Sequence, residues 1–375
     1  MLLLKLLFSL LILLAILVYV VNMTLVAKVK LQNANTAAPY QQGRFRNHAP
    51  STPRSLLDAA RLWIRFFTEK KVDTKPDIKI PVRPLRQQHL TSLSDNTIHI
   101  VKLGHSSILL KVYGEYWLLD PVFSERASPF QFIGPERFHT PPLSLAELPK
   151  LDKVLISHNH YDHLDKASIK LLAGKTEQFF VPIGVDGDLE KWGVPTSKIK
   201  TFDWWQEEPT SQGMIAFTPC QHFSGRGIGD SNSTLWGSWV IKTPQHNLYF
   251  SGDSGYFSGF KEIGETYGPF DLTMIETGAY DKDWATIHMK PEESVQAHID
   301  LKGKVMMPIH NGTFDLAFHT WHDPFDRVVA AAKQQDVDLT TPEFGQIFSI
   351  NDPAKLQIWW TATINDKGET SVTST

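Results

Sequence analysis

Apolar and polar positions form three distinct patterns along the chain. In the first, the stretch from Leu6 to Val21 reads LLFSLLILLAILVYVV and is broken only by Ser9. With its flanks from Leu2 to Ala27, a helix rising about 1.5 Å per residue could cross a hydrocarbon core of about 30 Å. Residues 1–27 are therefore expected to be a transmembrane anchor, with a cleaved signal peptide as the alternative.

The second pattern is a polar arm that contains one amphipathic helix. Residues 28–89 are predicted to form this arm, and a helix is expected within it at about 55–71. Its apolar positions recur every three or four residues: Leu56, Ala60, Trp63 and Phe67. Such a helix either lies on a membrane surface or packs its aromatic face on the following domain, and the packed arrangement is favoured.

The third pattern, from about residue 90 onward, is a series of short apolar runs separated by turn residues. Gly114 and Glu115 lie between two of these runs and indicate a hairpin. The expected strands are Ser107–Val112, Tyr116–Leu119, Lys153–Ile156, Gln178–Val181, Met214–Phe217, Trp239–Lys242, Asn247–Phe250, Leu272–Ile275 and Lys304–Pro308. Helices are expected to begin near Asp165, Pro291 and Asp323. Hairpins followed by alternating helices and strands predict two sheets with helices on their outer faces.

Length and composition are those of an ordinary globular protein. At 375 residues and 42% hydrophobic content, the chain can bury a full core. The predicted domain covers residues 90–362, and a polar tail covers 363–375. The formal net charge of −3 argues against a nucleic-acid partner, because such proteins are usually basic. Cys220 is the single cysteine, which excludes a disulfide within the chain, and we interpret it as a small buried residue.

Four side chains that bind metals well lie within six residues, directly after an apolar run. They are His158, His160, Asp162 and His163, in an H-x-H-x-D-H arrangement. Such a cluster can hold two metal ions on one loop, and that spacing is hard to explain otherwise.

Three further candidate ligands each follow an expected strand: His222, Asp253 and His310. Ligands at strand ends have rigid supports, which a preorganised site needs. Taken alone, each has a structural alternative, such as a hydrogen-bonded histidine or an aspartate that caps a turn. Together with the cluster they predict a dinuclear metal site. His105, which follows Gly104, is interpreted as structural.

Imidazole and carboxylate ligands suit zinc, with iron or manganese as alternatives. Two divalent ions about 3.5–4 Å apart would share a bridging hydroxide near neutral pH and stabilise the charge that develops during phosphoryl or acyl hydrolysis. The pattern therefore predicts a metal-dependent hydrolase that needs no serine or cysteine nucleophile.

Several segments around these residues carry a family resemblance, and they extend over roughly residues 90 to 350. They are 118–129 (LLDPVFSERASP), 157–165, 220–227 (CQHFSGRG), 249–256, 278–280 and 309–314. The chain resembles the metallo-β-lactamase superfamily and, within it, the N-acylphosphatidylethanolamine-hydrolysing phospholipase D branch with its bacterial relatives. The resemblance implies an αββα sandwich of two mixed sheets.

The resemblance also implies roles for individual residues. One metal would take His158, His160 and His222, the other Asp162, His163 and His310, and Asp253 would bridge both. Asp162, Asp253 and Asp120 are the expected catalytic carboxylates, and Asp120 would orient ligands without binding metal. Tyr161 and His288 would contact the substrate near the scissile phosphate. Phe223 and Asn311 depart from the family pattern, where a tryptophan is expected at 311, and leave the shape of the lipid groove open.

The activity expected from this resemblance is that of a zinc-dependent phosphodiesterase. It would cleave N-acylphosphatidylethanolamine, or a related phospholipid, to phosphatidate and an N-acylethanolamine. One alternative is a hydrolase of a soluble ester, such as a lactone or a sugar phosphate, on the same fold. The other is a non-catalytic membrane-tethered binding protein. Fold similarity alone does not decide among substrates.

The expected partners are a phospholipid substrate and a membrane, to which a single N-terminal span would attach the domain. Lys5 precedes the apolar run and Lys28 and Lys30 follow it, so the positive-inside rule favours a cytoplasmic domain only weakly. Lipid hydrolases of this branch commonly pair, which leaves a homodimer open.

Overall fold

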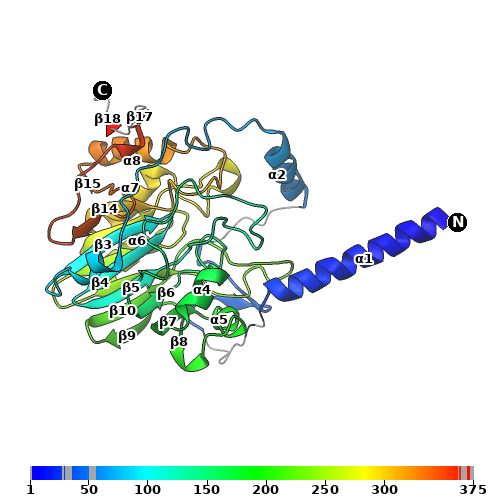
Figure 1. The fold of residues 1–375 in the computed structure, drawn as a ribbon, viewed down its shortest axis with the longest axis horizontal. Helices are drawn as coiled ribbons and strands as arrows, with labels where there is room; N and C mark the ends of the chain where they lie inside the picture. The colour runs from blue at the N-terminus through cyan, green and yellow to red at the C-terminus, as the bar shows by residue number, and fades with distance from the viewer. Residues whose placement is uncertain are drawn as a thin grey trace.

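Two mixed seven-stranded sheets form the centre of the protein, packed face to face with helices on both outer sides (Figure 1). The computed structural model describes residues 2–27, 29, 36–49, 56–361, 363–364 and 370–371; the side chains at 2–6, 8, 56, 59, 63, 67, 363–364 and 370–371 lie outside that description. The layers are those of the expected αββα sandwich, and that expectation is confirmed.

The first sheet has the strand order β16-β3-β4-β5-β6-β7-β8. Its strands are β3 (Ile98–Gly104), β4 (Ser107–Val112), β5 (Glu115–Leu119), β6 (Leu151–Leu155), β7 (Thr176–Pro182), β8 (Ile199–Phe202) and β16 (Ile347–Ser349). Pairing is antiparallel from β16 to β5 and parallel from β5 to β8. The helices α3 (Gln87–Thr91), α4 (Lys166–Leu172) and α5 (Asp186–Lys191) belong to this half, and the Asp165 carboxylate caps α4 by accepting from the Ala167 N–H.

The second sheet has the strand order β15-β14-β13-β12-β11-β10-β9. Its strands are β9 (Gln206–Thr210), β10 (Gly213–Thr218), β11 (Ser238–Lys242), β12 (Asn247–Phe250), β13 (Phe270–Glu276), β14 (Gly303–Ile309) and β15 (Asp338–Leu339). The helices α6 (Gly259–Thr266), α7 (Pro291–Asp300) and α8 (Asp323–Gln334) connect its parallel strands. Short pairs β1 (Tyr40–Gln41) with β2 (Arg44–Phe45), and β17 (Thr363–Ile364) with β18 (Thr370–Ser371), lie outside both sheets.

The main core lies between the two sheets, where large aromatic side chains meet. Trp117 comes from the first sheet, and Phe217, Trp239 and Phe250 come from the second. The Trp239 indole N–H donates to the Ile156 carbonyl across the interface, at 3.0 Å. Strands covered on both faces read as continuous apolar runs, and nine strands were expected near their observed positions. The strands β3, β8, β9, β15 and β16 were not expected, although β3 is also covered on both faces.

Two helices precede the sandwich. The first is α1 (Leu2–Leu25), and the second, α2 (Leu56–Thr68), falls where an amphipathic helix is expected. Within the described part of the chain, no helix is both long and apolar enough to cross a bilayer. The expected transmembrane helix is therefore not found among the described residues.

A lysine without a carboxylate beside it is buried in β3. The side chain of Lys102 is 2% exposed and lies near the rings of Phe325 and Phe344. Its ammonium donates to the Pro308 carbonyl at 3.0 Å and to Asn311 Oδ1 at 2.7 Å. Burial lowers the pKa of Lys102 to about 7, because the charged form is poorly solvated there.

Lys102 should make stability depend on pH in a defined direction. Between pH 7 and about 10.4 the unfolded chain holds the proton and the folded chain does not, so the free energy of unfolding should rise with pH, by up to about 1.4 kcal/mol per pH unit. The free energy of unfolding, measured by chemical denaturation at several pH values in this range, should rise less steeply with pH for Lys102→Met than for the wild type. Lys111→Met is the matched control, a buried lysine of the next strand whose amine pairs with Asp95. Equal slopes in the two variants would contradict this account.

Candidate metal centre

The expected ligands come from both sheets and meet at the ends of their strands. His158, His160, Asp162 and His163 lie on the loop between β6 and α4. His222, Asp253 and His310 follow β10, β12 and β14 respectively. With His105 and His288, these side chains form three groups in which the ligand atoms lie within 4.8 Å of one another. Two groups of four share no residue, and a third, of Asp253, His288 and His310, has a member in each of them.

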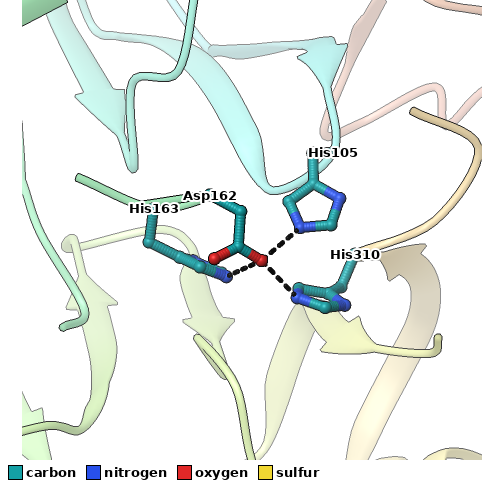
Figure 2. A group of neighbouring side chains, drawn as sticks. All are labelled: His105, Asp162, His163 and His310. Carbon is teal, nitrogen blue, oxygen red and sulfur yellow. Dashed lines mark hydrogen bonds and ion pairs between the residues drawn. The ribbon is translucent and has the colours of Figure 1, made fainter. Parts of the chain in front are cut away.

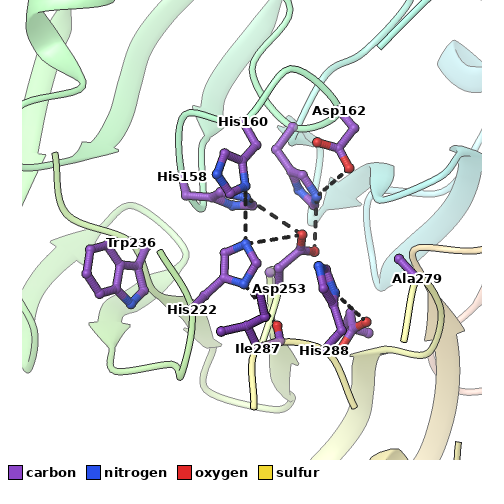
Figure 3. A network of polar contacts seen from close by, with 12 residues as sticks. His158, His160, Asp162, His222, Trp236, Asp253, Ala279, Ile287 and His288 are labelled. Atoms are coloured by element: carbon purple, nitrogen blue, oxygen red, sulfur yellow. Dashed lines mark hydrogen bonds and ion pairs between the residues drawn. The ribbon is translucent and has the colours of Figure 1, made fainter. Parts of the chain in front are cut away.

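The first group contains His158, His160, His222 and Asp253. His160 Nδ1 lies 2.8 Å from His158 Nε2 and 3.2 Å from His222 Nε2. Asp253 Oδ2 lies 3.7 Å from the Nε2 atoms of both His158 and His222. Figure 3 shows the three rings turned toward the Asp253 carboxylate. Three imidazoles and a carboxylate are a donor set that a divalent ion binds well.

The second group is built around the carboxylate of Asp162 (Figure 2). Asp162 Oδ2 lies 3.2 Å from His310 Nε2 and 3.6 Å from His163 Nε2. Asp253 also reaches this group, with contacts of 3.0 Å to His163 Nε2 and 3.1 Å to His310 Nε2. Asp253 thus lies between the two groups, in the position that the resemblance implies for a bridging ligand.

Electrostatics favour the metal-binding form of three of the five imidazoles. Burial lowers the pKa of His158 and His160 well below the ordinary value, and that of His222 to about 3. Neutral imidazole is the form that binds a metal. Burial alone would raise the pKa of Asp253, but His163 and His310 hold it well below its usual range. The carboxylate is therefore ionised. Burial alone would lower the pKa of His163 and His310, but Asp253 and Asp162 raise the pKa of His163 well above its ordinary value and that of His310 to about 10, so these two rings would release a proton on binding a metal.

Unsatisfied atoms give an independent test of whether a metal fits. His163 Nε2 and Asp253 Oδ1 are both buried and form no hydrogen bond, although they face each other at 3.0 Å. Buried polar atoms are normally satisfied, because leaving them without a partner is costly. A cation between the two would satisfy both atoms, so the residues fit a metal.

Asp120 contacts the ring nitrogen of His163 that faces away from the metal position. Its carboxylate is fully buried and lies 2.7 Å from His163 Nδ1. Ser157 makes two hydrogen bonds to that carboxylate. Its backbone N–H donates to Oδ1 at 2.7 Å, and its hydroxyl donates to Oδ2 at 2.6 Å. A proton shared with Asp120 on Nδ1 leaves Nε2 of His163 free to face the metal position.

His105, interpreted from sequence as structural, lies in the second group. Its Nε2 is 3.1 Å from Asp162 Oδ2, and its ring centroid is 4.0 Å from that of His310. The backbone at His105 is left-handed, with φ of 46°, and its N–H donates to Thr313 Oγ1. The signal that identified the other ligands, a histidine just past an apolar strand, was also present here.

The two residues expected to contact substrate have different surroundings. The Tyr161 hydroxyl donates to the Arg226 carbonyl at 2.6 Å, and the Arg226 guanidinium lies 4.0 Å from the centre of the tyrosine ring. His288 lies beside the ligands, 5.1 Å from the His222 ring centroid, and its Nδ1 is 3.0 Å from Glu276 Oε1. Glu276 is fully buried at the end of β13, and nothing in the sequence pattern distinguished it.

A cavity of about 290 Å³ opens onto the metal ligands. Its polar floor includes His160, Asp162, Asp253, His288 and His310, and its apolar walls include Leu62, Phe66, Phe223, Trp284 and Leu316. Leu62 and Phe66 belong to α2, so this helix forms part of the wall. Arg65 of α2 holds it in place through Asp281 at 3.0 Å and Asp283 at 2.6 Å, and Phe66 stacks on Trp284. The packed arrangement expected for the amphipathic helix is therefore the one observed.

Comparison with known proteins agrees with this geometry. A family model described as "Beta-lactamase superfamily domain" matches residues 116–311. The chain belongs to the metallo-β-lactamase superfamily. It is a metal-dependent hydrolase of that fold, with two His/Asp clusters that suit a binuclear metal site.

Three known proteins are similar to this chain, two in sequence and one in fold. An uncharacterised protein of Mycobacterium bovis is 39% identical over 326 residues, which cover 86% of this chain and 87% of that protein. N-acyl-phosphatidylethanolamine-hydrolyzing phospholipase D 1 of Caenorhabditis elegans is 32% identical over 276 residues, 69% of this chain and 78% of that protein. Among solved structures, the metallo hydrolase Igni18 of Ignicoccus hospitalis has a TM-score of 0.53 at 21% identity, covering 68% of this chain and 98% of that one. The last likeness shows the fold alone.

Removing the Asp120 carboxylate should weaken metal binding in this superfamily member. Asp120→Asn should lower the zinc affinity of the second group by about 10–100-fold, because the neutral amide has one acceptor oxygen for the contacts that both carboxylate oxygens make with Ser157 and His163. Competition with a chromogenic chelator would measure this. The matched control is Asp152→Asn, whose carboxylate accepts from the Tyr116 N–H away from the centre. Unchanged affinity in folded Asp120→Asn would show that the contact has no role in metal binding.

Proposed function

We propose that this protein is a zinc-dependent phosphodiesterase that hydrolyses N-acylphosphatidylethanolamine, or a related phospholipid, to phosphatidate and an N-acylethanolamine. The observation that carries the proposal is the cavity at the metal ligands, which combines a floor of histidine and carboxylate groups with apolar walls. A phosphodiester with attached acyl chains matches both surfaces. The similarity to the phospholipase D of C. elegans supports the same substrate class.

The residues of the centre divide the chemical task. When bound, two divalent ions supply an activated water and polarise the phosphoryl oxygens. His158, His160 and His222 would hold one ion, and Asp162, His163 and His310 the other, with Asp253 between them. The choice of zinc rests on the imidazole-rich donor set, and iron or manganese are the alternatives.

Groups around the ligands would position the lipid and exclude water. His288 is fixed on one side by Glu276, so its ring faces the ligands and can contact the phosphate group. Leu62 and Phe66 of α2 line one wall of the cavity and offer an apolar surface for acyl chains. Excluding water in this way strengthens the electrostatic interactions inside the site.

The location that suits such a substrate is a membrane. We propose that the protein is membrane-associated through its apolar N-terminal segment, which would raise the local concentration of enzyme at the bilayer. A homodimer remains a prediction from the resemblance.

The competing enzyme is a hydrolase of a soluble ester, such as a lactone or a sugar phosphate. It would use the same metal ligands but would not need the apolar walls contributed by α2. A non-catalytic binding role is the third possibility. The complete ligand set counts against it, because a site that has lost its activity commonly loses a ligand.

A lipid assay tests the proposal. Full-length zinc-loaded protein is incubated with N-acylphosphatidylethanolamine in mixed micelles, and the products are identified by mass spectrometry. The wild type should release phosphatidate and N-acylethanolamine, and His158→Ala or Asp253→Asn should lower the rate at least about a hundredfold, because the charge-stabilising centre is lost. His99→Ala is the matched control, at the opposite end of β3 from His105.

Three outcomes would reject the proposal. Full activity in either ligand variant would contradict the mechanism. A protein that holds two metals but hydrolyses only water-soluble esters would establish the competing enzyme, and one that hydrolyses neither kind of substrate would favour a binding role.

A further inference from the structure

The helix α1 presents an apolar surface to solvent all around its axis. Figure 1 shows it leaving the body of the protein beside α4 and α5. The apolar side chains described from Leu10 to Val20 are exposed on every side; Leu13, for example, is 64% exposed and Tyr19 is 65% exposed. Water covers so large a continuous apolar surface only at a high free-energy cost. A helix that is apolar all round is therefore normally covered by protein or lipid.

A second group of exposed apolar residues begins beside the C-terminal end of α1. We call this group the collar: Phe130, Phe132, Ile133 and Ile228. Phe132 is 81% exposed, Ile133 59% and Ile228 69%. These three are among the most exposed large apolar residues of the sandwich domain, and Phe130 is 37% exposed. The rings of Phe130 and Phe132 lie 5.4 Å apart, so the two aromatic side chains form one patch.

Specific contacts place the collar next to α1. Asn22 of α1 forms two hydrogen bonds with the backbone of Ile228. The Asn22 amide N–H donates to the Ile228 carbonyl at 3.0 Å, and the Ile228 N–H donates to Asn22 Oδ1 at 2.7 Å. A cavity of about 390 Å³ is lined by Thr24 and Leu25 of α1 and by Phe130 of the collar. The surface of α1 and that of the collar are therefore continuous.

The loop that carries the two phenylalanines is held firmly at its base. Arg126 donates to the Gly134 carbonyl at 2.7 Å and forms an ion pair with Glu136 on the opposite side of the loop. The Arg137 side chain donates to the Val122 carbonyl at 2.9 Å. The exposed rings at the tip are thus displayed by a well-bonded loop, which indicates a surface built for a partner.

Positive charge accompanies this apolar surface. Lys166 and Lys170 of α4 line the same cavity as Phe130, and both side chains are exposed. Lys191 of α5 donates to the Met23 and Val26 carbonyls at 2.8 and 2.7 Å, at the end of α1. Aromatic and aliphatic side chains beside lysines are the composition that binds the interface of an anionic bilayer.

We propose that the collar and α1 form one surface that docks on a bilayer containing anionic phospholipid. The inference rests on the proposed lipid-directed function and specifies where the membrane contacts the domain. Tyr161 and Arg226 line the cavity under the collar, and Tyr161 lies in the loop that carries four of the metal ligands. The bilayer would therefore contact the domain close to the loop that carries these ligands.

A fluorescent label at the tip of the collar tests this docking. Full-length Phe132→Cys is labelled with an environment-sensitive nitrobenzoxadiazole probe and transferred from detergent into vesicles of phosphatidylcholine and phosphatidylglycerol. The native Cys220 is only 2% exposed, and the labelled wild type measures any reaction there. Leu356→Cys is the matched control, an exposed apolar position that lines a different cavity together with residues of α8.

The expected result is a blue-shifted emission at position 132, protected from iodide, and no change at position 356. Phe132→Asp should lower partition into vesicles about tenfold, because an apolar side chain is removed from the interface. Equal iodide access at both positions in vesicle-bound protein would overturn the inference, as would a failure to bind vesicles. Protection at 132 without lipid, together with a doubled mass in solution, would show that a second copy of the chain covers the surface.

These vesicles contain no N-acylated headgroup, so the docking result does not depend on hydrolysis. Docking without any phosphodiesterase activity would leave the inference standing and reject the proposed reaction. Activity in micelles without docking would do the reverse.

Discussion

The metal centre depends on the carboxylate of Asp253. It is 2% exposed and lies between two groups of histidines, 3.7 Å from His158 and His222 on one side and about 3 Å from His163 and His310 on the other. A buried anion in that position is stable only with positive charge around it. Two divalent ions held by these residues would meet this requirement and would at the same time satisfy His163 Nε2 and Asp253 Oδ1, which form no hydrogen bond.

The two-sheet architecture brings the ligands to that carboxylate. β6 belongs to one sheet and β10, β12 and β14 to the other, so the centre forms only where the ends of both sheets meet. Close backbone packing keeps the geometry tight. Gly252, directly before Asp253, has φ of 57°, and an added Cβ there would lie 2.6 Å from the Ser157 side chain. Ser157 in turn holds Asp120, so one contact links the bridging carboxylate to the residue that orients His163.

Much of the fold and the ligand set could be predicted from sequence, because both produce local signals. Strands buried on two faces appear as apolar runs, and β4 and β12 have the bounds that were expected. The cluster from His158 to His163 needs only its spacing to be recognised. His105 gave a weaker signal, since a single histidine after a strand usually has a structural role, and its place beside Asp162 depends on how β3 packs against the ligand loop.

Other features depend on tertiary contacts that no sequence pattern expresses. The pairing of Glu276 with His288 joins residues from a strand end and a later loop, and the position of α2 over the cavity is set by Arg65 with Asp281 and Asp283. The Tyr161 hydroxyl donates a hydrogen bond to the Arg226 carbonyl. This contact depends on the conformation of the loop at 225–230, which no sequence pattern predicts.

The measurement that tests the central claim most directly is the metal content of the purified full-length protein. The chain is loaded with zinc, freed of unbound metal by gel filtration, and analysed by inductively coupled plasma mass spectrometry against protein concentration. A binuclear centre built around Asp253 predicts two zinc ions per chain. A content of one ion or none, in protein with the circular dichroism spectrum of the folded state, would contradict it.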